Sequence, residues 1–367
     1  MIEIIARKDN IMSKLKVAII GCGNIANSAH IPSYLYHKDE VEIKYFCDII
    51  KEKADRCVER YGCGIAIEDY HDAINDPEVD ALSICTPNLM HKTISIDALH
   101  AGKHVLCEKP AARIYSEALE MQKAQEETGK VLNIGVCCRF HAAVEEVRRR
   151  ILAGDLGEVY HIFINFREHR SIPGLGGAFT NKEIAGGGVL IDWGVHRLDQ
   201  VMYCLGDPEP KSVSAAAFSK LGCDIPNYRY RYMWSEDTKD VNGVFNVDDS
   251  VSAFIRTSGP VISLEGAWAE NLDLQEQHLD FLGTKAGIRL RYCGGFDMFY
   301  VNDEGEFVTD HWDPPADRDM YVDEVKSFID CIRTGEKTRA NIDYAIKTSK
   351  IMQGIYDSSD EGREIVF

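Results

Sequence analysis

A strand that runs directly into a glycine-rich turn decides the fold. That stretch is residues 16–26, which read KVAIIGCGNIA and join the apolar run 16–20 to a GxGxxA motif. Gly21 permits the tight turn, Gly23 lets a phosphate group reach the backbone, and the small Ala26 lets a helix pack closely on the strand. The first N–H groups of that helix are unpaired and lie at its positive end, so they attract anions. The motif predicts a pyrophosphate site for a dinucleotide, formed by Gly21, Gly23, Asn24 and Ile25.

The first 140 residues alternate between strand-like and helix-like patterns. Short apolar runs bounded by turn residues lie at Lys16–Ile20, Glu42–Cys47, Ala81–Cys85, His104–Cys107 and Val131–Val136. Polar stretches of helical length separate them, at Lys51–Tyr61, Thr93–Ala101 and Ser116–Thr128. This alternation predicts an α/β domain of the Rossmann type over residues 1–140, with a parallel sheet covered by helices on both faces.

The pattern changes after a predicted helix over Ala142–Ala153. Strand-like runs follow at Val159–Phe166, Val251–Ile255, Val261–Trp268, His278–Leu282 and Ile288–Tyr292. Two helices are predicted near the end of the chain, at Met320–Arg333 and Asp343–Ser358. Residues 141–367 are therefore predicted to form a second α/β domain with a large, mostly antiparallel open sheet. The pattern leaves open whether the two last helices pack back on the first domain.

The composition of the chain disfavours some classes of binding partner. Among 367 residues, 41 Lys and Arg against 59 Asp and Glu give a net charge of −18. This charge repels phosphate and disfavours nucleic acid and anionic membrane surfaces as partners. No apolar run reaches the roughly 18 residues of a membrane span, and residues 1–11 lack the apolar segment of a secretory signal. We therefore expect a cytoplasmic protein, and whether residues 1–11 are an extension ahead of Met12 stays open.

The cysteines and histidines do not predict a metal site. The twelve cysteines contain no CxxC spacing, and several lie in apolar strand-like runs, where a reduced thiol behaves as a small hydrophobic group. Reduced cysteines are favoured over disulfides because no export signal is present. His100 and His104 are four residues apart, but Gly102 ends the helix between them, so they do not share one helical face. No metal is expected.

An acidic residue ends the second predicted strand. Asp48 lies about 20 residues beyond the glycine motif, where a carboxylate accepts hydrogen bonds from the ribose hydroxyls of NAD. Asp48 would also repel the additional phosphate of NADP, and neighbouring Ile49 and Ile50 supply no cation to offset that repulsion. We therefore expect NAD rather than NADP. The alternative is that Asp48 is an ordinary turn residue at a strand end.

Two further motifs follow the third and fourth predicted strands. They are TPNLMH at residues 86–91 and EKP at residues 108–110, at the strand ends where ligands bind in such sheets. The set GxGxxA, TPNxxH and EKP at these intervals resembles the Gfo/Idh/MocA family of sugar and polyol oxidoreductases. The resemblance covers essentially the whole chain and implies the two-domain fold predicted above. It also implies contacts to NAD from Thr86, Pro87, Asn88, His91, Glu108 and Lys109.

The resemblance implies that Lys109 lies beside the nicotinamide and the reacting carbon. A lysine ammonium can polarise a substrate hydroxyl and stabilise the alkoxide that forms as hydride leaves. If the amine is partly desolvated, its pKa falls and it can accept the proton itself. Without this context, a lysine in a strand-end turn is more often a solvated surface charge.

A second motif of chemical interest lies in the second half of the chain. Residues 185–196 read AGGGVLIDWGVH, in which the glycines permit a tight loop ahead of a helix. Asp192, His196 and Asp199 are spaced at i, i+4 and i+7, so they share one helical face at the edge of the core, from which they can project into a cleft. The residues alone equally fit a capped helix with a partly buried histidine. The resemblance implies that Asp192 binds sugar hydroxyls and that His196 acts as acid/base with Lys109.

Two arginines complete the candidate substrate site. Arg139 matches an arginine of the family at the domain junction, where it either lines the cleft or forms an interdomain ion pair. Arg167 ends the first strand of the second domain, where it either meets a substrate or is a solvated strand end. The candidate substrate-binding residues are therefore Lys109, Arg139, Arg167, Asp192 and His196.

These features predict an NAD-dependent dehydrogenase that oxidises a secondary hydroxyl of a sugar or glycoside to a ketosugar, with hydride transfer to C4 of nicotinamide. Residues 172–179 and 192–196 are most similar to a bacterial subgroup that oxidises glycosides at C3. Two alternatives within the family remain open, an NAD-dependent glycosidase and a non-catalytic dinucleotide-binding regulator. The resemblance also implies a homo-oligomer formed through the open face of the second sheet.

Overall fold

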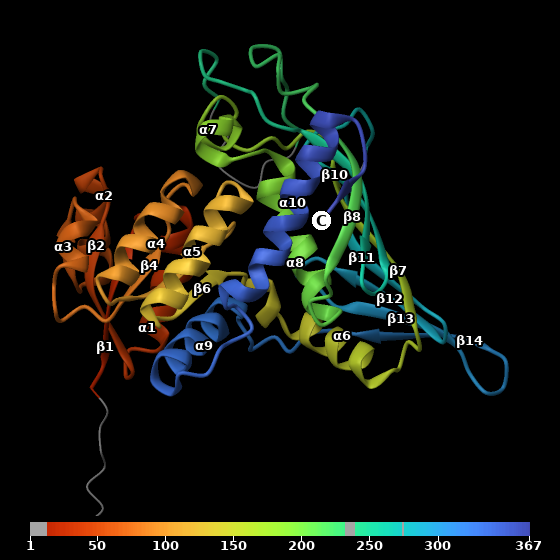
Figure 1. Cartoon of the computed structure of the whole chain (residues 1–367), viewed down its shortest axis with the longest axis horizontal. Coiled ribbons are helices and arrows are strands. Elements are labelled where there is room, and N and C mark those ends of the chain that lie inside the picture. The colour runs from red at the N-terminus through yellow and green to blue at the C-terminus, as the bar shows by residue number, and fades with distance from the viewer. Residues whose placement is uncertain (1–12, 232–238, 274) are drawn as a thin grey trace, which may run out of the picture.

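The computed structural model describes residues 13–231, 239–273 and 275–367 and contains two sheets with helices between them (Figure 1). Residues 1–12, which include the proposed extension, lie outside the described residues. Sheet A lies at the left of the view and sheet B at the right, and helices α8 and α10 run between them. Among the described residues, no helix has the length and apolar character needed to cross a membrane.

Sheet A has six parallel strands in the order β3-β2-β1-β4-β5-β6. The strands are β1 (Leu15–Ile20), β2 (Val41–Cys47), β3 (Ile65–Ile67), β4 (Ala81–Ile84), β5 (His104–Glu108) and β6 (Leu132–Gly135). All five predicted strands are confirmed, whereas β3 was missed because three partly exposed residues form no readable pattern. The order reverses between β1 and β4, and the carboxyl ends of strands at such a switch point form the ligand site of dinucleotide-binding sheets.

In the part of the chain that the structure describes, sheet B has nine strands in the order β14-β13-β12-β11-β7-β10-β9-β8-β15, of which only β7 and β10 pair in parallel. Its strands are β7 (Val159–Glu168), β8 (Pro210–Phe218), β9 (Ser250–Thr257), β10 (Val261–Ala267), β11 (Gln275–Gly283), β12 (Ala286–Arg291), β13 (Phe296–Val301), β14 (Phe307–Trp312) and β15 (Ile365–Val366). The prediction of a large, mostly antiparallel sheet is confirmed. Four strands were missed, among them β8, whose three consecutive alanines have little strand character.

The helices cover both faces of sheet A and one face of sheet B (Figure 1). The α-helices are α1 (Ile31–Tyr36), α2 (Lys51–Tyr61), α3 (Tyr70–Ile74), α4 (His91–His100), α5 (Tyr115–Thr128), α6 (Ala142–Ala153), α7 (Lys182–Ala185), α8 (Val195–Cys204), α9 (Met320–Thr334) and α10 (Ile342–Glu361). The 3₁₀ turns are η2 (Asn88–Met90), η3 (Cys137–Phe140) and η4 (Ala178–Thr180), and the π-helical turns are η1 (Ala26–His30) and η5 (Leu190–Gly194).

The last two helices complete the core around sheet A. From α9, Val325, Phe328 and Ile329 pack into the same cluster as β1 and β2. The first half of α10 packs against the other side of sheet A, and its second half packs into the core of sheet B. The end of the chain therefore stabilises the first domain and connects the two sheets.

A buried ion pair joins the two domains. Arg139 in η3 is fully buried and donates two hydrogen bonds of 2.7 Å to the two carboxylate oxygens of Asp199 in α8. It donates a further bond of 2.9 Å to Asp207, which follows α8. Of the two alternatives for Arg139, the structure therefore supports the interdomain ion pair. A buried charge is tolerated only when it is paired and hydrogen-bonded, so these bonds occupy the guanidinium and do not leave it for a substrate.

We predict that Arg139→Met lowers the free energy of unfolding by about 3–5 kcal/mol, because it leaves two buried carboxylates without their counter-charge. Chemical denaturation of the purified protein measures this loss. The matched control is Arg149→Met, which breaks an exposed pair with Glu146 and should cost less than about 1 kcal/mol. Equal losses in the two variants would contradict the role given to Arg139.

Candidate active site

The glycine turn after β1 has the geometry of a phosphate-binding loop. Gly21 has a φ of +93°, and a Cβ there would lie 2.7 Å from the carbonyl oxygen of Cys85 at the end of β4. Only glycine therefore fits where β1 passes β4. At Gly23, by contrast, a Cβ would meet nothing within 4 Å, so the backbone borders open space. This space beside the N–H groups of the turn suits an approaching pyrophosphate.

Asp48 lies directly beneath this turn. Its carboxylate accepts one hydrogen bond of 2.9 Å from the backbone N–H of Cys22 and one of 2.9 Å from that of Ile50. The side chain is partly exposed and borders the glycine loop. Asp48 therefore orders the loop. Its bond to Ile50 is one that an ordinary turn residue also makes, so the contact of Asp48 with the ribose stays a prediction.

The TPNxxH and EKP loops are held together by His91. This histidine is fully buried, and its ring nitrogens lie 2.9 Å from the Thr86 carbonyl oxygen and 2.8 Å from that of Pro110. Both nitrogens face the backbone, so His91 positions the two loops, and its contact with NAD stays a prediction. The Thr86 hydroxyl oxygen is buried and has no hydrogen-bond partner among the described residues, which leaves it available to a ligand.

Two polar groups extend the site toward the first helix and the second domain. Glu108 is buried, and its carboxylate lies 2.7 Å from a ring nitrogen of His30 in η1. Burial alone would raise the pKa of Glu108, but the hydrogen bond from His30 and the charges of His30 and Lys109 outweigh it and lower that pKa. Asn88 donates a bond of 2.8 Å to the carbonyl oxygen of Ala185, ahead of the glycine loop. Pro87 is exposed at the same strand end.

Lys109 and Asp192 meet across the domain junction. The Lys109 ammonium lies 3.4 Å from the Asp192 carboxylate and 3.3 Å from its carbonyl oxygen. Burial raises the pKa of Asp192, and the adjacent ammonium offsets part of that rise. A weak hydrogen bond from the indole of nearby Trp268 also lowers the pKa of Asp192, and neither the indole nitrogen nor the second carboxylate oxygen has a well-formed hydrogen bond among the described residues. The Asp192 carboxylate is therefore held between an ammonium and an indole.

Asp192 lies in η5 because the preceding glycines let the chain pass very close to two other elements. A Cβ at Gly187 would lie 2.0 Å from the Tyr356 hydroxyl, and one at Gly188 would lie 1.9 Å from the carbonyl oxygen of Asp248. The buried Asp248 carboxylate then accepts bonds of 2.7 and 3.0 Å from the first N–H groups of this turn, at Gly188 and Leu190. It satisfies donors that have no partner within a helix.

His196 lies one turn after Asp192, on α8. Burial, together with the charges of Lys109 and Arg197, lowers the pKa of His196 well below its usual value. The imidazole is therefore neutral at neutral pH and able to accept a proton. Its Nδ1 lies 3.8 Å from the Cys138 sulfur. The structure thus brings Lys109, Asp192 and His196 into one neighbourhood, as the sequence predicted.

Three other predicted residues have different surroundings. Asp199 was expected to project into a cleft but is bound by the buried Arg139, which requires a counter-charge. Arg139 itself does not line the site, because its guanidinium is bound to Asp199 and Asp207. Arg167 alternates with the inward Phe166 on β7, so it lies on the opposite face of sheet B, where it pairs with Glu270 at 2.8 Å. The prediction of substrate contacts by Arg139 and Arg167 is therefore not supported.

Several residues of the site were not predicted. Asp248 and Trp268 lie far from the motifs along the chain, and His30, four residues after the glycine motif, has its role only through contact with the distant Glu108. A pair of acidic residues after Val247 is the one local feature that marks Asp248, and such pairs are common in turns.

The residues present fit a bound NAD. Gly23 borders open space at the turn, the Thr86 hydroxyl is unpartnered, and Asp48 orders the loop. Gly21, Asn24 and Ile25 belong to the same turn. Lys109 and His196 come from different domains but lie at the same end of sheet A, beyond the carboxyl end of β5. An ammonium, a neutral imidazole and a carboxylate at this position can manage the proton of a substrate hydroxyl.

Known proteins share this architecture along nearly the whole chain. D-glucoside 3-dehydrogenase of Escherichia coli (strain K12) is 32% identical over 355 residues, which cover 96% of this chain and 97% of that protein. Levoglucosan dehydrogenase of Pseudarthrobacter phenanthrenivorans is 27% identical over 300 residues, which cover 77% of this chain and 74% of that protein. A solved levoglucosan dehydrogenase in complex with NADH superposes with a TM-score of 0.83 at 23% identity, covering 96% of this chain and 99% of that one.

Two family models match the two halves of the chain. The oxidoreductase family with an NAD-binding Rossmann fold matches residues 15–136, and the GFO/IDH/MocA C-terminal domain matches residues 144–289. The first match lies over sheet A and the glycine turn, and the second begins in α6 and extends into β12. The chain therefore belongs to the Gfo/Idh/MocA family of NAD-binding oxidoreductases.

Proposed function

We propose that this protein is an NAD-dependent dehydrogenase that oxidises a secondary hydroxyl of a sugar or glycoside to a ketosugar. The observation that carries the proposal is the contact of Lys109 with Asp192 across the domain junction, beside the neutral imidazole of His196. Several relatives are named as sugar dehydrogenases, which supports a carbohydrate as the substrate. The second carboxylate oxygen of Asp192, which has no well-formed hydrogen bond among the described residues, suits a substrate with several hydroxyl groups.

The proposed roles follow from the charge of each group. When bound, NAD supplies the hydride acceptor for oxidation of an alcohol. The Lys109 ammonium stabilises negative charge on the substrate oxygen as its proton departs. The neutral His196 accepts that proton. Asp192 orients the sugar through its second carboxylate oxygen and holds the ammonium in place with the first. A lone ammonium would polarise the hydroxyl without removing its proton, so both groups are needed.

We propose C3 of the sugar as the oxidised carbon. The support is the relative named as a D-glucoside 3-dehydrogenase, which matches this chain over nearly its full length. A glycosidase that uses NAD transiently and a regulator that binds NAD without turnover are the competing functions. A regulator has no chemical need for an ammonium and an imidazole at one site, and both are present here.

The test is to incubate the purified protein with a panel of sugars and glycosides and to examine the products by mass spectrometry. The expected result is a loss of two hydrogens at C3 of at least one of them. Hydrolysis without net oxidation would identify a glycosidase, and NAD binding without any turnover would identify a regulator.

In the same assay, Lys109→Ala should lower kcat/KM by about 10²–10⁴-fold, because a positioned acid/base group contributes that much. This loss corresponds to about 3–5 kcal/mol of transition-state stabilisation. NAD binding should survive, and the control Lys92→Ala, which removes a surface pair with Glu120, should keep wild-type turnover. Wild-type turnover in Lys109→Ala would remove this lysine from the mechanism.

We further propose that Asp48 makes the protein select NAD over NADP. Asp48→Ser should weaken NADH binding by about tenfold or more, because hydrogen bonds to a charged group contribute about 1.5–3 kcal/mol. The same change removes the charge that repels the additional phosphate, so the ratio of NADPH to NADH affinity should rise. Fluorescence titration measures both affinities, with Asp55→Ser on the outer surface of α2 as control. An unchanged ratio would contradict the proposal.

We also propose that the protein is a homo-oligomer that assembles through the outer face of sheet B. The helices pack on the other face (Figure 1), and Phe163, Phe254 and Phe299 are 41%, 37% and 45% exposed. Ser263 pairs with both Phe163 and Phe254, so these two rings lie in one row across the sheet. A second copy that presents the same face would bury them.

Light scattering should therefore give a multiple of the 41.2 kDa chain mass. Phe163→Lys should shift the distribution toward the single chain, because it puts a charge into the apolar contact. Tyr36→Lys, at an exposed position on α1, is the control and should not change the mass. A single-chain mass for the wild type at micromolar concentration would contradict the proposal.

A further inference from the structure

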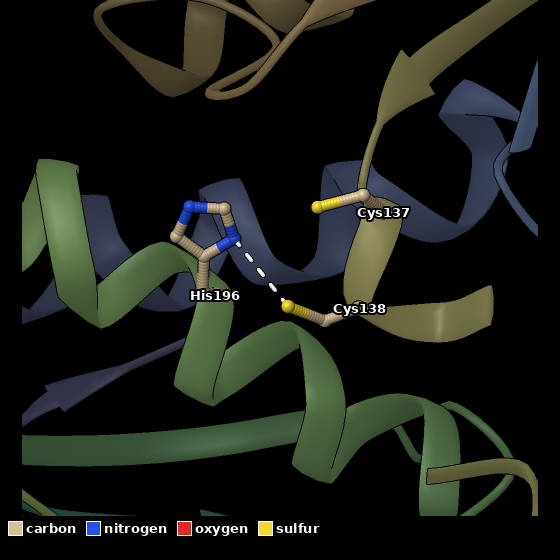
Figure 2. A group of neighbouring side chains, drawn as sticks. All are labelled: Cys137, Cys138 and His196. Carbon is tan, nitrogen blue, oxygen red and sulfur yellow. Dashed lines mark hydrogen bonds between the residues drawn. The ribbon is translucent and has the colours of Figure 1, made fainter. Parts of the chain in front are cut away.

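Two cysteines and the histidine of the site form a cluster that the proposed reaction does not use in full. The sulfur atoms of Cys137 and Cys138 and a ring nitrogen of His196 all lie within 4.8 Å of one another. Figure 2 shows the three side chains converging, the cysteines from η3 and the histidine from α8. Cys138 lies 3.8 Å from His196, and the Cys137 thiol hydrogen-bonds with Cys138 and Tyr321, but neither thiol has a part in the proposed reaction.

The spacing of these atoms is close to that of ligands on one zinc ion. Zinc binds thiolate at about 2.3 Å and imidazole at about 2.0–2.1 Å in tetrahedral geometry, so two of its ligands lie about 3.5–3.8 Å apart. The Nδ1 to sulfur distance of 3.8 Å is at the upper end of this range. Small rotamer changes would bring the Cys137 sulfur to about the same distance from the other two atoms, because both cysteines already point toward the ring (Figure 2).

The buried ion pair holds the cluster in place. Arg139 follows Cys138 directly in η3, and its partner Asp199 lies one turn after His196 on α8. The bidentate bond between them therefore fixes the two elements that carry the three side chains. A preformed set of ligands needs little reorganisation to accept an ion.

The surroundings of the cluster contain charges of both signs. Lys109 and Arg197 lie near His196, and Glu108 and Glu324 lie near Cys137. Glu324 on α9 has a buried carboxyl oxygen without a hydrogen-bond partner among the described residues. Tyr292, directly after β12, and Tyr321 on α9 face the same cysteines. Burial raises the pKa of Glu324, so only Glu108 offsets one of the two cations, and the thiolates that form on binding offset the charge of a divalent ion.

We propose that Cys137, Cys138 and His196 bind one zinc ion, and that the bound ion inhibits the enzyme. Thiolate and imidazole ligands together select zinc and similar ions over magnesium or calcium. On binding, each cysteine that ligates the ion releases its thiol proton to solvent, and the ion takes the Nδ1 lone pair of His196. The other ring nitrogen then carries the proton, so the imidazole no longer accepts one from a substrate. The inhibitory part of this inference rests on the proposed function, whereas the binding part does not.

The binding test uses cobalt(II) with the full-length, metal-stripped, reduced protein. One equivalent should produce the near-ultraviolet charge-transfer band of cobalt–thiolate bonds and visible bands of tetrahedral cobalt, and zinc should remove both by displacement. Cys138→Ser and Cys137→Ser should each weaken cobalt binding by more than about 100-fold, because loss of even an outer-shell partner costs 10–100-fold. Cys331→Ser, a buried cysteine on α9, is the matched control and should bind as the wild type does.

The inhibition test measures sugar oxidation against zinc concentration. Zinc should inhibit the wild type and Cys331→Ser at a concentration at least tenfold lower than it inhibits Cys138→Ser. Circular dichroism confirms that each variant is folded, and Cys137→Ser replaces Cys138→Ser if the latter is not. If the cobalt–thiolate band is absent from the wild type, or is unchanged in both Cys137→Ser and Cys138→Ser, the proposed metal site is wrong. Equal zinc sensitivity of wild type and Cys138→Ser would overturn the inhibition, whereas a thiolate band without any sugar oxidation would overturn only the proposed function.

Discussion

The arrangement of the site depends on the buried guanidinium of Arg139. This charge lies between the two domains and is tolerated because Asp199 and Asp207 neutralise it with hydrogen bonds of 2.7–2.9 Å. Asp199 is on the same helix as His196, and η5 with Asp192 leads directly into that helix. The ion pair therefore fixes how far these two side chains lie from Lys109, which comes from the end of β5. A loss of this constraint would separate the acid/base groups without changing any of them.

Each domain supplies groups that the other needs. Sheet A provides the glycine turn, Asp48 and Lys109, and the second domain provides Asp192 and His196. The ammonium of Lys109 partly compensates the buried carboxylate of Asp192, and together with burial it keeps His196 neutral. The charge of Lys109 thus lowers the pKa of both Asp192 and His196. The ammonium therefore supplies the counter-charge that a buried carboxylate needs, and the carboxylate supplies one for the lysine.

The parts of this structure that could be predicted from the sequence are local. Gly21 and Gly23 predict the turn, because the backbone geometry allows only glycine at Gly21 and open space borders Gly23. The helical spacing of Asp192 and His196 predicts that they share one face of a helix. The roles of Asp199 and Arg167 could not be predicted, because each depends on a partner distant in sequence. Asp248 caps η5 across some 60 residues. The cluster of Cys137, Cys138 and His196 was missed for the same reason, since its spacing along the chain matches no metal motif.

Lys109 and His196 are proposed to act on the same substrate hydroxyl from two sides of the domain junction. A double-mutant cycle in kcat/KM tests this proposal most directly, with Lys109→Met, His196→Asn and the double variant on one oxidised sugar. Residues that act as a unit are strongly non-additive, so the double variant should be scarcely slower than the slower single variant, with a coupling above about 1 kcal/mol. Losses that multiply, so that the coupling is zero, would show two independent groups and contradict the account.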